Sequence, residues 1–232
     1  MKIFLSIKNR SFEFLHDVFL LPKICLFNFR ALPLCQAIRL PLYVNYGVKI
    51  KEIHHGNIII QNDDIRKYMI SFGRGGSEGI AITSAGLISL KRTSRIIFKG
   101  TAHFHAGSRL CLDEKANVVI GDGFSANRNF TLYYNNEAFF GNDCMLGWNI
   151  EIIDGNGHIV LENNIKHTQK CKICLGNHVW VGANVKICRS VEIGDNCIVA
   201  YGSTIVGGKF QMGTMIGGYP AKMIKSNVNW VK

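Results

Sequence analysis

A polar, glycine-rich stretch of this 232-residue sequence holds an aspartate and a histidine four positions apart. Residues 154–158 read Asp-Gly-Asn-Gly-His, and regular patterning returns only at Lys172. An imidazole titrates near neutral pH, so His158 is a candidate general base that could take a proton from a hydroxyl group. The two glycines would let Asp154 turn back and fix the tautomer of that ring, as the acid of a catalytic triad does. The alternative is that both side chains are solvated residues of a surface loop.

The other histidines among the eight in the chain lack such a setting. His178 occupies a turn position and is expected to be solvated. His103 and His105 alternate along a predicted strand, where they either face a groove or simply lie on the surface. No neighbouring pattern indicates chemistry at His54, His55 and His167.

The frame that would position the polar stretch is a repeat of six residues. Aliphatic side chains recur at every sixth position, namely Leu175, Val181, Ile187, Ile193, Val199 and Ile205. A period of six fits neither a helix nor simple strand alternation, but it is typical of a parallel β-helix. Each hexad would form one side of a three-sided coil, with its aliphatic residue stacked in the core on those of neighbouring coils.

Hexads also precede the polar stretch, which therefore interrupts an otherwise regular solenoid between Ile153 and Lys172. Between residues 45 and 121, short aliphatic runs separated by Gly, Asn or Asp predict degenerate early coils. We therefore expect an all-β solenoid over residues 45–222, followed by a tail at 223–232. Because loops on a rigid scaffold commonly carry function, the interruption is the place where chemistry is expected.

Residues 1–44 precede the repeat and are basic and apolar. Charged residues and prolines interrupt each apolar run before it reaches the roughly 20 residues needed to span a bilayer. We expect a short amphipathic helical cap and lead-in. This cap either packs on the end of the solenoid or rests on the inner membrane surface.

Charge and cysteine content limit the class of partner. The 27 Lys and Arg against 16 Asp and Glu give a formal net charge of +11, which serves either solubility or attraction to an anionic partner. Nucleic acid is disfavoured, because no basic helix or zinc-finger spacing accompanies the charge. Cys144 and Cys197 fall at inward positions of hexads and are expected to be buried thiols in a reducing cytoplasm. Cys171 and Cys174 have the spacing of half a zinc site, but no second half follows.

The hexads and the closing segment, Ile216-Gly-Gly-Tyr-Pro-Ala-Lys-Met-Ile-Lys225, resemble the hexapeptide-repeat acyltransferases. Residues 115–225 match that pattern well and residues 45–115 loosely, and Tyr219 replaces the usual Asn of the closing motif. The resemblance implies a left-handed parallel β-helix, acetyl-CoA as co-substrate, and a homotrimer that binds the cofactor between subunits. The related β-helix carbonic anhydrases need three convergent histidines, which this sequence does not offer, so no metal is expected.

Residues 146–159, Leu-Gly-Trp-Asn-Ile-Glu-Ile-Ile-Asp-Gly-Asn-Gly-His-Ile, are similar to the branch that O-acetylates surface polysaccharides. That branch carries Ser-Trp-Asn followed by Asp-x-Asp-x-His, whereas here Gly147 stands for Ser and Asn156 for the second Asp. The resemblance implies a cytoplasmic enzyme, either free or peripheral at the inner membrane. It would transfer acetyl directly to a hydroxyl of a bacterial capsule, O-antigen or exopolysaccharide sugar, with His158 as the base.

The same resemblance assigns roles to further residues. Gly182 or Ala183 would donate the backbone N–H that stabilises the oxyanion. The acceptor would contact Trp180, Trp148, Asn149 and Asn156, although Trp180 could instead only cover the edge of the prism. The pantetheine arm would lie along Ala183, Tyr201, Gly202 and Val206. The nucleotide phosphates would meet Lys222 and Lys225 as point charges.

Two other functions stay open at this stage. The same chemistry could act on a small acceptor, such as a nucleotide sugar, an amino sugar, serine or a streptogramin-type antibiotic. Alternatively, the solenoid could be a non-catalytic scaffold of a glycan-assembly complex. Acceptor screening distinguishes acetylation of a polysaccharide from acetylation of a small acceptor. Failure to bind acetyl-CoA would indicate the non-catalytic scaffold.

Overall fold

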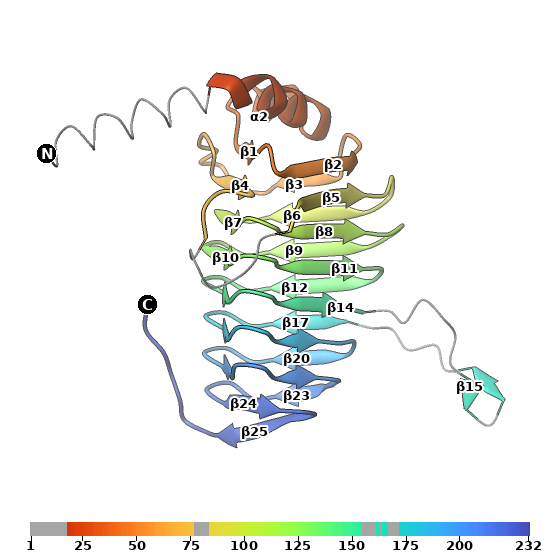
Figure 1. The fold of residues 1–232 in the computed structure, drawn as a ribbon, viewed down its shortest axis with the longest axis vertical. Coiled ribbons are helices and arrows are strands. Elements are labelled where there is room, and N and C mark those ends of the chain that lie inside the picture. Colours follow the sequence, from red (N-terminus) through yellow and green to blue (C-terminus); the bar gives the residue numbers. More distant parts are fainter. Residues whose placement is uncertain (1–17, 77–83, 155–160, 163, 167–171) are drawn as a thin grey trace, which may run out of the picture.

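Three parallel β-sheets wrap around one elongated core (Figure 1). The computed structural model of the chain describes residues 18–76, 84–154, 161–162, 164–166 and 172–232. Along the coils of the prism, successive strands belong to sheets A, B and C in turn, and a strand pairs in parallel with the strand one full coil later. For example, β4 (Ile70–Phe72) pairs with β7 (Ala102–Phe104), and β7 pairs with β10 (Phe124–Ala126). The predicted parallel β-helix is therefore confirmed.

The three sheets form the three sides of the prism. Sheet A contains β1 (Leu42–Val44), β4 (Ile70–Phe72), β7 (Ala102–Phe104), β10 (Phe124–Ala126), β13 (Met145–Leu146), β18 (Trp180–Val181), β21 (Ile198–Val199), β24 (Met215–Gly218) and the antiparallel β25 (Ala221–Lys225). Sheet B contains β2 (Val48–Glu52), β5 (Gly86–Leu90), β8 (Arg109–Leu112), β11 (Thr131–Tyr134), β14 (Glu151–Ile153), β19 (Lys186–Ile187) and β22 (Thr204–Ile205). Sheet C contains β3 (Ile58–Ile60), β6 (Arg95–Phe98), β9 (Asn117–Ile120), β12 (Glu137–Phe140), β17 (Ile173–Leu175), β20 (Val191–Ile193) and β23 (Gly208–Phe210).

The register stacks the predicted core residues on one another. Each hexad aliphatic lies opposite its counterpart one coil later, namely Leu175 opposite Ile193, Val181 opposite Val199 and Ile187 opposite Ile205. All six side chains are buried. Burial of one such side chain stabilises a fold by about 1.5–3 kcal/mol, so the stacked column is a main source of stability.

Cys144 and Cys197 are buried thiols, as the hexad pattern predicts. Burial raises the pKa of the Cys144 thiol to about 11, which keeps it protonated at neutral pH. Its Sγ donates a hydrogen bond to the carbonyl oxygen of Gly176 at 3.1 Å. Cys171 lies outside the described residues, and within the described part of the chain no group of His, Cys, Asp and Glu side chains is arranged to hold a metal ion.

The N-terminal cap consists of a helix at residues 18–31 and the short α2 (Leu34–Ala37), which lie across the end of the prism (Figure 1). Asn28 fixes the helix to β1, because its side-chain amide donates to the carbonyl of Leu42 and accepts from the amide of the same residue. The helix thus packs on the end of the solenoid, one of the two placements that the sequence allows. No helix among the described residues is both long and apolar enough to cross a membrane.

The C-terminal tail runs back along the corners between sheets C and A. The amide of Val228 donates to the carbonyl of Gly213, and the indole N–H of Trp230 donates to the carbonyl of His178 at 2.9 Å. The Trp230 ring stacks on the imidazole of His178 with centroids 4.1 Å apart. His178 is thus a turn residue, as expected, but it is only partly exposed because the tail packs on one face of its ring.

Candidate active site

The polar stretch leaves the prism at the corner between sheets B and C. Asp154 is the last described residue after β14, and Lys172 is the first before β17. Between them, the antiparallel pair β15 (Leu161–Glu162) and β16 (Ile165–Lys166) stands away from the coils in Figure 1. His158, Asn156 and His167 lie outside the described residues.

Asp154 is held in place at the root of this stretch. Its side chain is only 2% exposed, so it is no solvated loop residue. Oδ2 accepts hydrogen bonds from the amide of Asn135 and from Nδ2 of Asn136, both at 2.8 Å. No described residue donates to the other carboxylate oxygen, Oδ1, or to the buried Oδ1 of Asn135. A buried acceptor without a donor costs about 1–3 kcal/mol, so this corner is suited to accept a further N–H or O–H.

A ladder of asparagines forms the corner between sheets A and B. Nδ2 of Asn129 donates to Oδ1 of Asn149 at 3.0 Å, and Nδ2 of Asn149 donates to Oδ1 of Asn184 at 2.9 Å. Nδ2 of Asn184 in turn donates to the hydroxyl of Tyr201. The three asparagines have φ between 56° and 60°, a left-handed conformation that Asn tolerates better than most residues. Asn149 therefore has a structural role in this ladder, whatever acceptor it meets.

The same corner distinguishes the two candidate oxyanion donors. The amide of Gly182 donates to the carbonyl of Val199 at 2.8 Å and is already used within the sheet. No described residue accepts a hydrogen bond from the amide of Ala183. A Cβ at position 147 would lie 2.8 Å from that nitrogen, so Gly147 leaves the amide uncovered on this side. Ala183 is accordingly the better candidate for the oxyanion donor.

Trp180 projects from the outer face of sheet A and is 39% exposed. Its neighbours in register are Met145 and Ile198, and the tail places Trp230 beside it with ring centroids 6.1 Å apart. Trp148 lies half-buried at the corner between sheets A and B. The two tryptophans are thus on the same side of the prism, with Trp180 on the sheet and Trp148 at its edge.

The predicted cofactor residues lie at both edges of sheet B. Tyr201 and Gly202 share a corner with Ala183, whereas Val206 follows β22 at the opposite corner, below Asp154. Lys222 and Lys225 are exposed on β25 at the end of the prism. Asn149 and Asp154 lie five positions apart on either side of β14, and at about 3.3 Å per residue the two edges of sheet B are roughly 16 Å apart.

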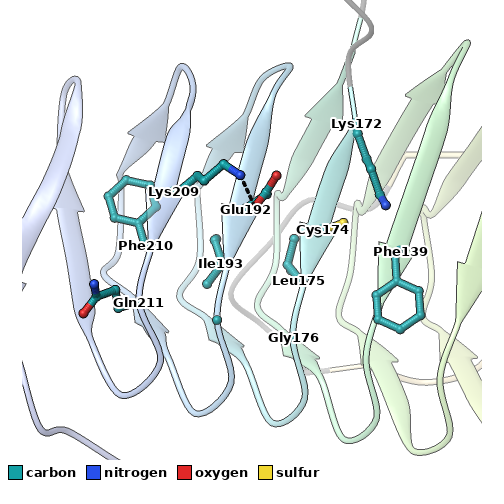
Figure 2. A pocket seen from close by; sticks show the side chains of 11 residues that line it. Phe139, Lys172, Cys174, Leu175, Gly176, Glu192, Ile193, Lys209, Phe210 and Gln211 are labelled. Atoms are coloured by element: carbon teal, nitrogen blue, oxygen red, sulfur yellow. Dashed lines mark ion pairs between the residues drawn. The ribbon is translucent and has the colours of Figure 1, made fainter.

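A groove on the outer face of sheet C begins where the polar stretch returns to the prism. Its volume is about 440 Å³, and Phe139, Lys172, Cys174, Glu192, Lys209 and Phe210 contribute to its lining. Apart from Lys172, which precedes β17, these residues lie on β12, β17, β20 and β23, which are neighbours in sheet C. Figure 2 shows their side chains, with Nζ of Lys209 paired to Glu192 at 2.9 Å. Phe139 and Phe210 stand at its two ends, about 14 Å apart for three strand spacings. Among the residues that the structure describes, no site residue predicted above lines this groove.

Comparison with known proteins identifies the repeat. Residues 175–207 match the family model described as bacterial transferase hexapeptide (six repeats). The chain carries this hexapeptide repeat. It is 30% identical over 112 residues to galactoside O-acetyltransferase of Escherichia coli (strain K12), a match that covers 47% of the chain and 54% of that protein. It is 31% identical over 121 residues to polysialic acid O-acetyltransferase of Neisseria meningitidis, covering 51% and 54% respectively.

The hexapeptide-repeat chain therefore spans about half the length of the relatives that it matches. Among solved structures, the crystal structure of the polySia specific acetyltransferase NeuO aligns with 82% of this chain and 78% of that chain. The TM-score is 0.45 and the sequence identity is 18%.

Sequence reasoning missed two features of the hexapeptide-repeat chain. The sheet C groove has a weak sequence signal, because Cys174, Glu192 and Lys209 recur at nearly the coil length, and each stands one position before a buried or, for Lys209, a partly buried apolar residue. The tail has no such signal, since Trp230 lies 52 residues from the His178 carbonyl that it contacts. Trp230 and His178 meet only because the tail starts from the last coil and runs back along the prism.

Proposed function

We propose that the chain is an acetyl-CoA-dependent O-acetyltransferase that acts on a sugar hydroxyl of a bacterial surface glycan. The observation that carries the proposal is the buried Asp154, which offers an unpartnered carboxylate oxygen four residues before His158. The hexapeptide repeats and the two relatives, both O-acetyltransferases by name, also support it. The proposed enzyme is cytoplasmic.

In the proposed reaction, His158 removes the proton from the sugar hydroxyl as its oxygen attacks the thioester carbonyl. The amide of Ala183 donates a hydrogen bond to the oxyanion that forms. When the C–S bond breaks, the coenzyme A sulfur leaves and takes the proton from the imidazolium, so the acetyl ester and free coenzyme A are the products. Oδ1 of Asp154 accepts from the second ring N–H of His158 and fixes its tautomer.

The proposed enzyme is a homotrimer with its site between neighbouring copies. Ala183 and Asp154 lie at opposite edges of sheet B in one chain, which supports a site that takes the base from one copy and the oxyanion donor from the next. Ala183, Tyr201, Gly202 and Val206 would line the pantetheine arm, and Lys222 and Lys225 would bind the phosphates. Sedimentation equilibrium should give three times the 25.9 kDa of one chain, and a fully active monomer would contradict the shared site.

The acceptor would stack on Trp180 and Trp148 and meet Asn149 and Asn156. The experiment is transfer from radiolabelled acetyl-CoA to a panel of acidic and neutral polysaccharides, nucleotide sugars, amino sugars and serine. We expect label on a polysaccharide as an ester that hydroxylamine cleaves. Label on a small acceptor alone would favour the small-molecule alternative, and failure to bind acetyl-CoA would favour the scaffold.

A further inference from the structure

The helix at residues 18–31 has two apolar faces. One face packs on the prism through Leu20, Ile24, Phe27 and Ala31, all of them buried. The other face presents Phe19, which is 69% exposed, Leu26, which is 68% exposed, and the exposed Phe29. At about 100° per residue, the second set centres roughly 150° from the first. Capping the prism therefore accounts for only one of the two faces.

The short α2, in the same cap, also exposes apolar side chains. Leu34 and Ile38 are four residues apart, which places them on one side of the turn, and both are exposed. Single exposed apolar residues are ordinary, but a cluster of five on one end of a molecule indicates an interaction surface. We call Phe19, Leu26, Phe29, Leu34 and Ile38 the cap surface.

The segment that carries the cap surface has charge of one sign. Residues 18–47 contain Lys23, Arg30 and Arg39 and no Asp or Glu. Nζ of Lys23 is occupied by the carbonyl oxygens of Asn45 and Val48, each at 2.7 Å. Arg30 and Arg39 are exposed, and Arg30 lies next to the Phe19 side of the apolar stripe in the helical projection.

We infer that the cap surface docks on an anionic membrane. Exposed aromatic and aliphatic residues flanked by arginine are the features with which an amphipathic helix enters the interface of a bilayer that contains acidic lipids. A second copy of the chain is the rival occupant. Its cap would bring the same arginines into apposition, and residues 18–47 hold no Asp or Glu to pair with them, while the nearby Asp64 is already paired with Arg66 at 3.1 Å, so charge complementarity favours the lipid surface.

The test is co-sedimentation of the full chain with vesicles. Vesicles of phosphatidylcholine with about one third phosphatidylglycerol should bind the protein in a salt-dependent manner, and pure phosphatidylcholine should bind it weakly. Leu26→Ser with Phe29→Ser should lower partitioning by at least about tenfold, because two side chains that would enter the bilayer are removed. Arg30→Gln with Arg39→Gln should reduce the preference for anionic vesicles. The matched control is Met212→Ser with Val231→Ser, two exposed apolar residues far from the cap, which should bind as the wild type does.

Equal binding of the Leu26→Ser, Phe29→Ser variant and the wild type would overturn the inference. So would an equal loss in the control, or self-association of the wild type that this variant abolishes while no vesicles bind. All substituted side chains are exposed, so the variants should fold, and circular dichroism checks this. Acetyl transfer to a soluble acceptor should be unchanged in the cap variants. A failure to bind membranes would therefore not contradict the proposed activity, and a failure of the proposed activity would not contradict membrane binding.

Discussion

His158→Ala is expected to lower kcat for acetyl transfer by about 10²–10⁴-fold, the range for loss of a general base. A sugar hydroxyl is barely ionised at neutral pH, so without the imidazole it would have to attack while still protonated. The substitution removes a proton acceptor and no binding surface, so the KM for acetyl-CoA should change little. Steady-state release of free coenzyme A in the presence of the acceptor measures both quantities.

His167→Ala is the matched control, because His167 belongs to the same polar stretch. It should retain nearly full activity. If His158→Ala transferred acetyl at a near-normal rate, or if His167→Ala lost as much, the base would have to be sought elsewhere.

Asp154→Asn tests whether the buried carboxylate positions the base. As a positioning residue, Asp154 favours the imidazolium by its charge, so its loss should lower kcat and displace the acidic limb of the kcat/KM profile to lower pH. A purely structural role through Asn135 and Asn136 would lower thermal stability and leave that limb in place. A shift of the acidic limb to lower pH therefore indicates positioning of the base, and an unshifted limb indicates a structural role.

Phe104→Ala is expected to lower the free energy of unfolding by about 3–5 kcal/mol, the usual cost of removing a buried phenylalanine ring. Phe104 is fully buried, and its ring centroid lies 5.1–6.2 Å from those of Phe72, Phe124, Phe130 and Phe98. Four rings would lose contacts at once, and the surrounding strands are fixed by ladder hydrogen bonds and cannot close the cavity. Urea unfolding followed by circular dichroism measures the change.

Phe139→Ala provides the control with the same change of side chain. Phe139 lies on the outer face of β12, where its ring is partly exposed, so little core packing is lost. Its unfolding midpoint should stay close to that of the wild type. Equal destabilisation by the two substitutions would mean that the central phenylalanines do not carry the stability of the early coils.

The later coils could be predicted from the sequence because their corners are short. Leu175 and Ile193 are eighteen residues apart and lie opposite each other, as three hexads to a coil require. The early coils hide the same arrangement. Ile58 lies opposite Ile96, thirty-eight residues later, because longer corners lengthen that coil. The six-residue phase is lost there, although the strands still pair in parallel from coil to coil, with one register shift between β2 and β5.

The sequence alone determined the solenoid, its buried thiols and the place where the polar stretch interrupts it. The physical reason is that stacked coils need an apolar residue at fixed intervals along the chain. A break in that interval can therefore be read directly from the sequence. The tertiary structure decided which groups are free to act. Three such features depend on residues in other coils or in the tail. They are the burial of Asp154, the amide of Ala183 that donates to no described residue, and the stacking of Trp230 on His178. The hydrogen-bond partners of Asp154 and Trp230 lie 18 or more residues away along the chain, at separations that no local pattern encodes.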